Sequence, residues 1–278
     1  MTLEIVPLSP VIGAEIRGIK LCLPQDEATR SALLTAWHDN VLLLFRDQEF
    51  PGESLNHSAD WIGTLGARAR PEERRQETDP YIMLVSNIRE NGVPIGSLPD
   101  GEMWFHHDMA FVDTPHKATF LHAVEVPETG GNTKFANMYA AYERLPDTLK
   151  RSIEGRRVLQ VFDFNQTGMP DLNNLDGIKH AVQPAVVRHP ETGRRALYVN
   201  RLMTATIMDM NPDEARRLLD EVISHAEDPA ITYEHHWRTS DYVVWDNRCS
   251  THARTDFHPS ERRLLRRGMI EGAPMIAA

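Results

Sequence analysis

A histidine and an aspartate two residues apart, His106 and Asp108, have the residue types and spacing to bind a metal. In a β-strand, residues i and i+2 point to the same side, so a strand would place both side chains on one face. A third ligand would have to come from elsewhere in the chain. Two histidines and one carboxylate leave three positions of an octahedron open, which is typical of non-haem Fe(II) oxygenases. A lone His-x-Asp is weak evidence, so an ordinary surface strand remains the alternative.

A basic segment near the other end of the chain indicates a second kind of site. Residues 248–267 contain six arginines and two acids, a local charge of +4 in a chain whose formal net charge is −10. A basic cluster in an acidic protein favours a small anionic ligand, with a solvated arginine-rich surface as the alternative. The overall acidity argues against nucleic acid as a partner, because little positive charge is available to neutralise phosphates.

Taken together, the two regions resemble the taurine dioxygenase/TfdA family of Fe(II)/2-oxoglutarate-dependent dioxygenases. In that family W-x-x-D or W-H-x-D supplies a histidine and an aspartate, and W-D-N-R-x-x-x-H supplies a second histidine; the matching residues here are 104–108 and 245–252. One departure is local, because Phe105 stands between Trp104 and His106. The likeness covers nearly the whole chain in the family's order. Its other segments are 43–48, 86–88, 130–133, 139–143 and 197–200.

The resemblance implies a metal site and a co-substrate site. His106, Asp108 and His252 would bind Fe(II) by one face. Arg263, which lies 11 residues after the second histidine, would bind the distal carboxylate of 2-oxoglutarate, with the Thr133 hydroxyl as a second donor. The planar fork of an arginine suits a carboxylate better than a lysine does.

The resemblance also implies a place for the substrate. Arg267, 15 residues after His252, would contact an anionic group of the substrate. In a strand, residues 263 and 267 would point into the same barrel, whereas 262 and 266 would point outward. Met203 and Glu102 are weaker candidates for substrate contacts.

The reaction implied by this resemblance uses Fe(II), 2-oxoglutarate and O2 to hydroxylate a small carboxylate, sulfonate or sulfate, with release of succinate and CO2. Hydroxylation beside a heteroatom would be followed by fragmentation of the product. A first alternative is hydroxylation of an amino acid or biosynthetic intermediate without cleavage. A second, non-enzymatic alternative is a jelly-roll protein that binds a metal without turnover. The expected ligand set argues against it, because such a protein has no need of three open metal positions.

The remaining histidines and the second cysteine are expected to be structural. Strand alternation turns His107 away from the metal, and it separates the neighbours His235 and His236 to opposite sides. We expect Cys249 to be a packed thiol.

Many short strands are needed to position these residues, and few regular helices join them, which argues against a doubly wound α/β fold. We therefore predict a mainly β fold with flanking helices, a double-stranded β-helix or jelly roll. The expected strands lie at about 41–45, 81–88, 103–111, 117–126, 132–137, 158–162, 181–189, 195–200, 231–237, 241–246 and 263–270. The expected helices lie at about 26–40, 53–65, 139–154 and 211–226.

No composition break divides the chain, so we predict one dioxygenase domain over residues 1–278, with lid loops at about 66–80 and 89–103. No apolar run approaches the ~20 residues of a membrane span, so no membrane partner is expected. Two cysteines and the lack of a secretory leader favour the cytoplasm. We also expect a homo-oligomer, a dimer or a tetramer.

Overall fold

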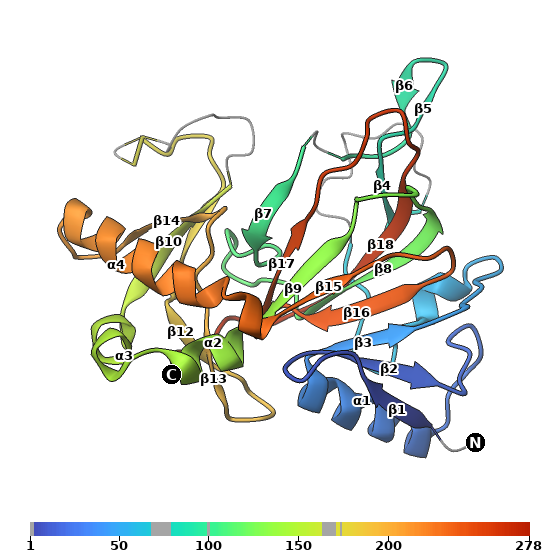
Figure 1. Cartoon of the computed structure of the whole chain (residues 1–278), viewed down its shortest axis with the longest axis horizontal. Helices are drawn as coiled ribbons and strands as arrows, with labels where there is room; N and C mark the ends of the chain where they lie inside the picture. The colour runs from blue at the N-terminus through green and yellow to red at the C-terminus, as the bar shows by residue number, and fades with distance from the viewer. Residues whose placement is uncertain (1–2, 68–78, 99–100, 163–170, 173) are drawn as a thin grey trace.

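Two facing, mainly antiparallel sheets form the centre of the computed structural model. The structure describes residues 3–67, 79–98, 101–162, 171–172 and 174–278. The larger sheet has the strand order β1-β2-β3-β16-β8-β18-β4, with one parallel pair, β2 and β3. The smaller sheet has the order β15-β9-β17-β7 (Figure 1). The strands of the larger sheet are β1 (Glu4–Pro7), β2 (Ala14–Arg17), β3 (Leu42–Phe45), β4 (Met83–Ser86), β8 (Ala118–Glu125), β16 (Tyr242–Asp246) and β18 (Leu264–Ile270). Those of the smaller sheet are β7 (Met103–His106), β9 (Thr133–Asn137), β15 (Thr232–His235) and β17 (Ser250–Arg254).

The other elements surround these sheets. Figure 1 shows α1 beneath the β1–β3 side of the larger sheet, whereas α2, α3 and α4 gather on the opposite side of the molecule near β10 and β14. The helices are α1 (Glu27–Asn40), α2 (Met138–Arg144), α3 (Asp147–Ile153) and α4 (Pro212–Ala226), with short 3-10 turns η1 (Ser54–His57) and η3 (Pro229–Ile231). The outer strands are β5 (Arg89–Glu90), β6 (Val93–Pro94), β10 (Arg157–Val161), β11 (His180–Pro184), β12 (Val186–Arg188), β13 (Arg195–Leu197) and β14 (Thr204–Ile207).

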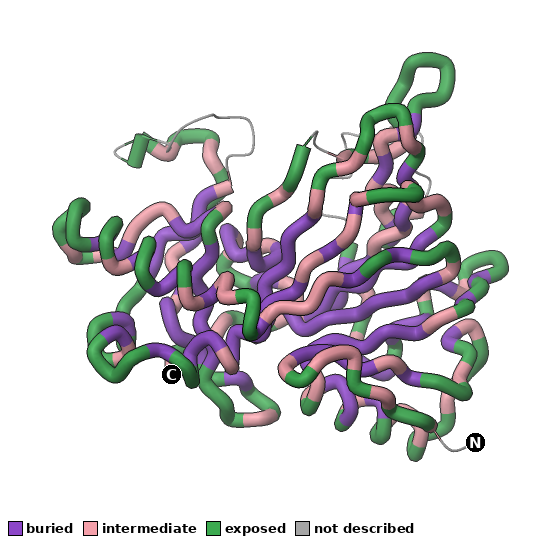
Figure 2. Tube along the Cα trace, viewed as in Figure 1, coloured by how far each residue is buried: buried purple, intermediate pink, exposed green. Residues whose placement is uncertain are grey.

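The central strands of the larger sheet are buried on both faces, which explains why they are apolar without alternation. In β3, Leu42 and Leu44 belong to the core between the sheets, whereas Leu43 and Phe45 belong to the core under α1. Successive strand residues point to opposite faces, so a strand covered on both sides must be apolar throughout. Figure 2 shows β3, β16 and β8 as one buried band. The site is built on this band of buried strands.

The fold prediction is confirmed, because the chain is mainly β with flanking helices. The strand at 117–126 appears as β8, and the helix at 26–40 appears as α1, with Asp26 accepting a hydrogen bond from the Thr29 backbone N–H at its N-terminus. Such a cap satisfies one of the free donors of the first turn. The strands β14 and β17 were absent from the prediction, although β17 carries His252.

Two helix predictions are corrected. The helix expected at 53–65 is only the short turn η1, where the Ser58 hydroxyl donates to the Leu55 carbonyl and competes with regular helix formation. The helix expected at 139–154 is divided into α2 and α3 at Pro146, which has no N–H to donate and disfavours helix in the residue before it.

The two predicted lid loops are only partly visible. Residues 68–78 of the first loop and 99–100 of the second lie outside the described residues. The described part of the second loop contains the hairpin of β5 and β6. Among the described residues, no helix is both long and apolar enough to cross a membrane.

Candidate metal centre

His106, Asp108 and His252 meet between the two sheets. His106 at the end of β7 and His252 in β17 are register partners, and their ring centroids are 4.1 Å apart. The Nε2 atoms of both histidines lie 3.8 Å from Asp108 Oδ1. One potential ligand atom from each residue lies within 4.8 Å of the other two. Three ligands gathered on one side of a common point suit a single divalent cation with its remaining positions open.

The sequence predicted this grouping by strand alternation, and that reason is corrected. Strand β7 ends at His106, and Asp108 belongs to the turn that follows. Met109 in this turn has a left-handed backbone with φ of 59°. The turn, rather than the pleat of a strand, therefore brings the carboxylate back beside the imidazole.

The protonation states of the three side chains suit metal binding. Burial lowers the pKa of His106 and of His252, which keeps both imidazoles neutral. Burial alone would raise the pKa of Asp108, but the charge of Arg267 and the hydrogen bond from Thr119 hold it well below its usual range. Neutral imidazoles and an ionised carboxylate are the forms that bind metals.

The histidine tautomers also fit a metal. His106 Nδ1 lies 2.9 Å from the carbonyl oxygen of Trp104, which can only accept, so Nδ1 carries the hydrogen and Nε2 offers a lone pair. His252 Nδ1 is buried and has no hydrogen-bond partner among the described residues. The Nε2 atoms of both rings face Asp108 Oδ1, so a cation held between these three atoms would bind to both histidines.

Arg263 lies immediately before β18 and is 2% exposed. Its Nε donates a 3.2 Å hydrogen bond to the Gly131 carbonyl, whereas its buried Nη1 has no partner in the described part of the chain. Burial, with a contribution from nearby Arg254, lowers the pKa of Arg263 to about 9. A buried guanidinium with an unused N–H is completed by an anionic ligand.

The Gly-Gly-x-Thr segment holds the loop against this arginine. A Cβ on Gly130 would lie 2.3 Å from the backbone oxygen of Asp256, so only glycine permits the contact. Thr133 is buried, and its hydroxyl oxygen accepts a 3.0 Å hydrogen bond from Trp237 Nε1. The hydroxyl hydrogen of Thr133 therefore remains available for another acceptor.

Arg267 lies beside the metal-binding candidates. Its Nη2 is 2.5 Å from Asp108 Oδ1, and its side chain is 20% exposed. The two residues predicted with it are placed differently: Met203 is packed in the core, and Glu102 is exposed just before β7. Their assignment to substrate therefore stays a prediction.

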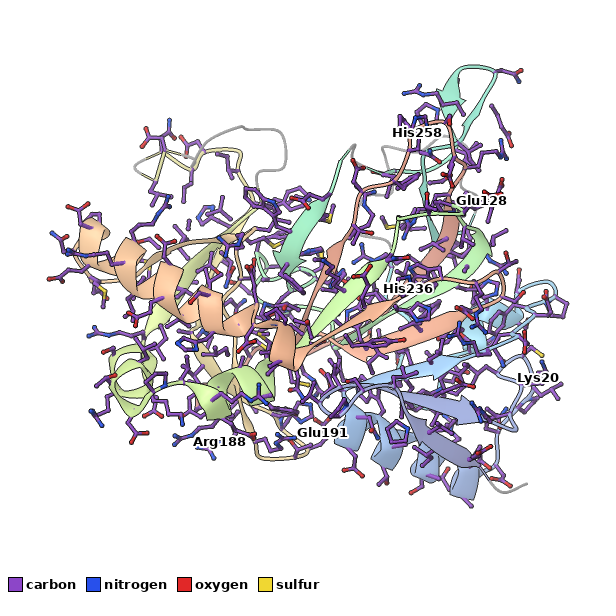
Figure 3. The ribbon with its side chains drawn as sticks, in the orientation of Figure 1. Lys20, Glu128, Arg188, Glu191, His236 and His258 are labelled. Carbon is purple, nitrogen blue, oxygen red and sulfur yellow. The ribbon has the colours of Figure 1, made fainter. Side chains whose placement is uncertain are left out.

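The histidines that the sequence set aside are structural. His107 is completely buried, with its ring 4.2 Å from that of Tyr198 and its Nδ1 3.3 Å from Asn200 Nδ2. His235 is buried and contacts Asp241 at 3.1 Å, whereas its neighbour His236 is exposed (Figure 3). The two neighbours therefore have different surroundings, as expected, but strand alternation is not the reason, because β15 ends at His235.

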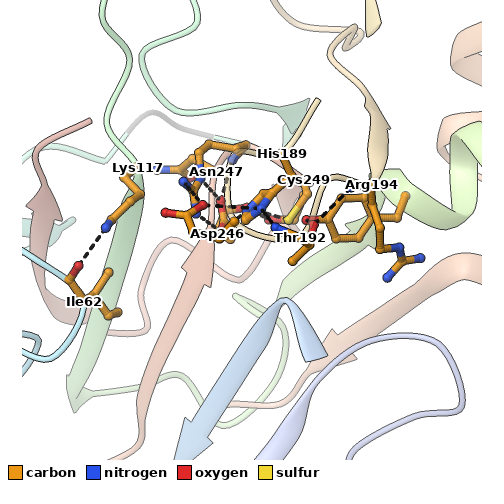
Figure 4. A network of polar contacts seen from close by, with 12 residues as sticks. Ile62, Lys117, His189, Thr192, Arg194, Asp246, Asn247 and Cys249 are labelled. Atoms are coloured by element: carbon orange, nitrogen blue, oxygen red, sulfur yellow. Dashed lines mark hydrogen bonds and ion pairs between the residues drawn. The ribbon is translucent and has the colours of Figure 1, made fainter. Parts of the chain in front are cut away.

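A second group of metal-ligand types was not predicted as a cluster. His189, Asp246 and Cys249 lie close together at the far end of β16 (Figure 4). The Asp246 carboxylate already accepts hydrogen bonds from His189 Nε2 at 2.9 Å and from Arg248 Nε and Nη2 at 2.9 and 2.6 Å. Burial raises the pKa of the Cys249 thiol well above its ordinary value, so it stays protonated. This group is a closed polar network.

Sequence reasoning also missed two residues behind Asp108. Thr119 in β8 donates a 2.6 Å hydrogen bond from its hydroxyl to Asp108 Oδ2, and Asn247 Nδ2 lies 2.9 Å from the same hydroxyl. The only signal was a polar residue, Thr119, in the otherwise apolar run 118–121.

Comparisons with known proteins agree with this geometry. The family described as "Taurine catabolism dioxygenase TauD, TfdA family" matches residues 4–269. Pentalenolactone F synthase of Streptomyces arenae is 32% identical, covering 95% of this chain and 94% of that protein. The (S)-phenoxypropionate/alpha-ketoglutarate-dioxygenase of Sphingobium herbicidovorans is 30% identical, covering 98% and 96%.

Solved structures share the fold over almost the entire chain. A taurine dioxygenase from Burkholderia xenovorans has a TM-score of 0.82 and 26% identity, covering 99% of this chain and 93% of its own. AAD-2, in complex with Mn(II) and N-oxalylglycine, has a TM-score of 0.81 and 28% identity, covering 99% and 100%.

Proposed function

Because the chain belongs to the TauD/TfdA family of Fe(II)/2-oxoglutarate-dependent dioxygenases, we propose that His106, Asp108 and His252 are the ligands of its iron. The observation that carries this proposal is that one potential ligand atom of each residue lies within 4.8 Å of the other two. Family membership also decides against the alternative of a metal-binding protein without turnover. Iron with 2-oxoglutarate supplies the activation of O2 that hydroxylates a small anionic substrate and releases succinate and CO2.

The residues around the metal centre bind and orient the two organic acids. We propose that Arg263 binds the distal carboxylate of 2-oxoglutarate through its unused Nη1, with the Thr133 hydroxyl donating a second hydrogen bond. Burial of Arg263 strengthens this contact, because little water competes for the guanidinium. Arg267, beside Asp108, would bind the anionic group of the substrate and so place the carbon to be hydroxylated next to the metal.

The substrate we propose is a small organic acid or sulfate ester. Relatives of this chain act, by their names, on (S)-phenoxypropionate, on 2,4-dichlorophenoxyacetate and on sulfate esters. Oxygen attached to the carbon that is hydroxylated makes the product fragment. A biosynthetic intermediate hydroxylated without cleavage is the second candidate, favoured by the similarity to pentalenolactone F synthase.

A substrate screen tests this proposal. The protein loaded with Fe(II) and 2-oxoglutarate would be offered aryloxyalkanoates, alkyl sulfates, sulfonates and amino acids, and oxygen-dependent succinate would be measured. We expect one anionic class to stimulate succinate formation, and Arg267→Gln to raise the KM for that class. Arg262→Gln is the matched control, because Arg262 is exposed and paired with Glu125. Stimulation only by uncharged compounds would contradict the role of Arg267.

We further propose that the chain acts as one domain, in the cytoplasm and as a dimer or tetramer. A core that continues from the sheets to α2 and α4 supports the single domain. The free state of Cys22 and Cys249 is compatible with a reducing compartment. Light scattering after size-exclusion chromatography would test the oligomeric state, and a monomeric mass would contradict it.

A further inference from the structure

The two oxygens of Asp108 have different surroundings. Oδ1 faces the Nε2 atoms of His106 and His252 at 3.8 Å each. Oδ2 points away and accepts the 2.6 Å hydrogen bond from Thr119. This distance is in the range of charge-assisted O–H···O⁻ hydrogen bonds, which are about twice as strong as neutral ones. Arg267 also contacts Oδ1, but each carboxylate oxygen has two lone pairs, so Oδ1 still has one for a metal.

The number of available hydrogens determines which atom donates in each hydrogen bond behind Asp108 Oδ2. The Thr119 hydroxyl donates to Asp108 Oδ2, so its single hydrogen is used there. The hydroxyl oxygen must then accept from the Asn247 amide, whose Nδ2 lies 2.9 Å away. The same Nδ2 lies 3.3 Å from the His116 carbonyl, which also only accepts. Turning the amide over would place an oxygen against both acceptors, so its orientation is determined.

The backbone makes this arrangement rigid. Thr119 lies in β8 between β16 and β18, opposite Trp245 on one side and Met269 on the other. Asn247 follows β16 directly, and its backbone N–H donates a 3.0 Å hydrogen bond to the Lys117 carbonyl. Both side chains are completely buried. A β-branched threonine in a strand has a restricted χ1 angle, so the hydroxyl has few alternative positions.

We propose that Thr119, oriented by Asn247, is a positioning residue that confines Asp108 to one-oxygen coordination of the metal. The inference rests on the proposed function of Asp108 as a ligand. If Oδ2 were free, the carboxylate could turn and bind through both oxygens. It would then occupy a fourth position, and only two would remain for a co-substrate that needs two and for O2. The hydrogen bond to Thr119 therefore keeps the third position open.

The test compares Thr119→Val, which has the same shape without a hydroxyl, with Thr119→Ser, which keeps it. Binding of Mn(II) alone and the visible band of Fe(II) with 2-oxoglutarate would be measured without oxygen. A second bound oxygen would not weaken Mn(II) binding, but it would take a position that 2-oxoglutarate needs. We therefore expect Thr119→Val to bind Mn(II) at least as well as wild type, and to need about 10- to 100-fold more 2-oxoglutarate for the Fe(II) band, the size typical of outer-shell changes. Thr119→Ser should restore the wild-type dependence on 2-oxoglutarate.

Two controls separate this role from a general loss of packing. Thr251→Val removes another buried threonine hydroxyl, whose contact is Met138 Sδ, and should leave the dependence on 2-oxoglutarate unchanged. Asn247→Ala leaves Thr119 in place, so it should raise the 2-oxoglutarate requirement less than Thr119→Val does. The inference is overturned if Thr119→Val develops the band at the wild-type concentration of 2-oxoglutarate, or if the serine variant needs as much as the valine variant. Failure of the wild-type protein to bind Fe(II) with 2-oxoglutarate would instead overturn the proposed function.

Discussion

Two buried clusters in this protein contain the same kinds of side chain but differ in how their polar atoms are paired. In the first, the Nε2 atoms of His106 and His252 each face one carboxylate oxygen of Asp108 at 3.8 Å, too far for a hydrogen bond. In the second, Asp246 accepts hydrogen bonds from His189 and Arg248 at 2.6–2.9 Å. We call them the open cluster (His106, Asp108, His252) and the closed cluster (His189, Asp246, Cys249).

The difference shows what distinguishes a metal site from a structural network. Buried polar atoms without partners are costly, so several that converge on one point indicate a ligand. The closed cluster leaves no such gap, because His189 Nε2 and the Asp246 carboxylate are hydrogen-bonded to each other. Residue types and short distances would therefore identify both clusters as metal sites. Only the pairing of hydrogen-bond donors with acceptors distinguishes the two.

The largest effect is expected from removing a ligand in the open cluster. His106→Ala should reduce metal affinity by more than the roughly 10- to 100-fold typical of outer-shell changes. Metal binding would be measured by equilibrium dialysis with Mn(II). Its control is His236→Ala, which changes the exposed histidine directly after β15. Equal binding by His106→Ala and wild type would remove the distinction between the clusters.

The corresponding change in the closed cluster should affect stability instead. Asp246→Asn removes the charge that pairs with Arg248 Nε and Nη2 and leaves only Glu191, on Nη1. Breaking a buried ion pair typically costs about 3–5 kcal/mol of unfolding free energy, and the remaining contact with Glu191 should keep the loss at the lower end. Urea unfolding would measure the loss, and Mn(II) affinity of the folded protein should stay near the wild-type value. A stable variant with weakened metal binding would reverse the roles assigned to the clusters.

Arg263 extends the open cluster to the co-substrate. Arg263→Lys keeps a positive charge but loses the planar fork, and hydrogen bonds to charged groups are worth about 1.5–3 kcal/mol. The KM for 2-oxoglutarate should therefore rise about 10- to 100-fold. Succinate formation at varied 2-oxoglutarate would show it, with Arg262→Lys as the exposed control. An unchanged KM would place the co-substrate elsewhere.

A smaller effect on pH dependence is expected beside the closed cluster. His38 packs against His189, with ring centroids 5.6 Å apart, and burial lowers the pKa of His38. Below about pH 6.5 the unfolded chain takes up a proton that the folded protein resists, so stability falls as pH falls. His38→Leu should make the free energy of unfolding depend less on pH between about pH 7 and 5, the range around the ordinary histidine pKa. An unaltered slope in urea unfolding would contradict the assignment.

The smallest effect is expected for Cys249. Its thiol is buried and stays protonated, so Co(II) should produce no thiolate charge-transfer band. Wild type and Cys249→Ala should give the same ultraviolet spectrum with Co(II). A band that disappears in the variant would show that the closed cluster binds metal.

The sequence predicted which residues form the open cluster better than it predicted the backbone that positions them. The family resemblance identified His106, Asp108 and His252. Alternation gave the wrong reason for Asp108 and for the separation of His235 from His236, because β7 ends at His106 and β15 ends at His235. Thr119 and Asn247 were missed because their contact is made across strands distant in the chain. The helix expected at 53–65 failed because side-chain hydrogen bonds to the backbone override apolar spacing.

One titration tests the central claim that the open cluster is the metal centre. Fe(II) would be added without oxygen to wild type, His106→Ala and Asp246→Asn, each saturated with 2-oxoglutarate, while the visible charge-transfer band is followed. We predict a band that saturates at one iron per chain in wild type, persists in folded Asp246→Asn and is lost in His106→Ala. A band that survives in His106→Ala and disappears in Asp246→Asn would contradict the account.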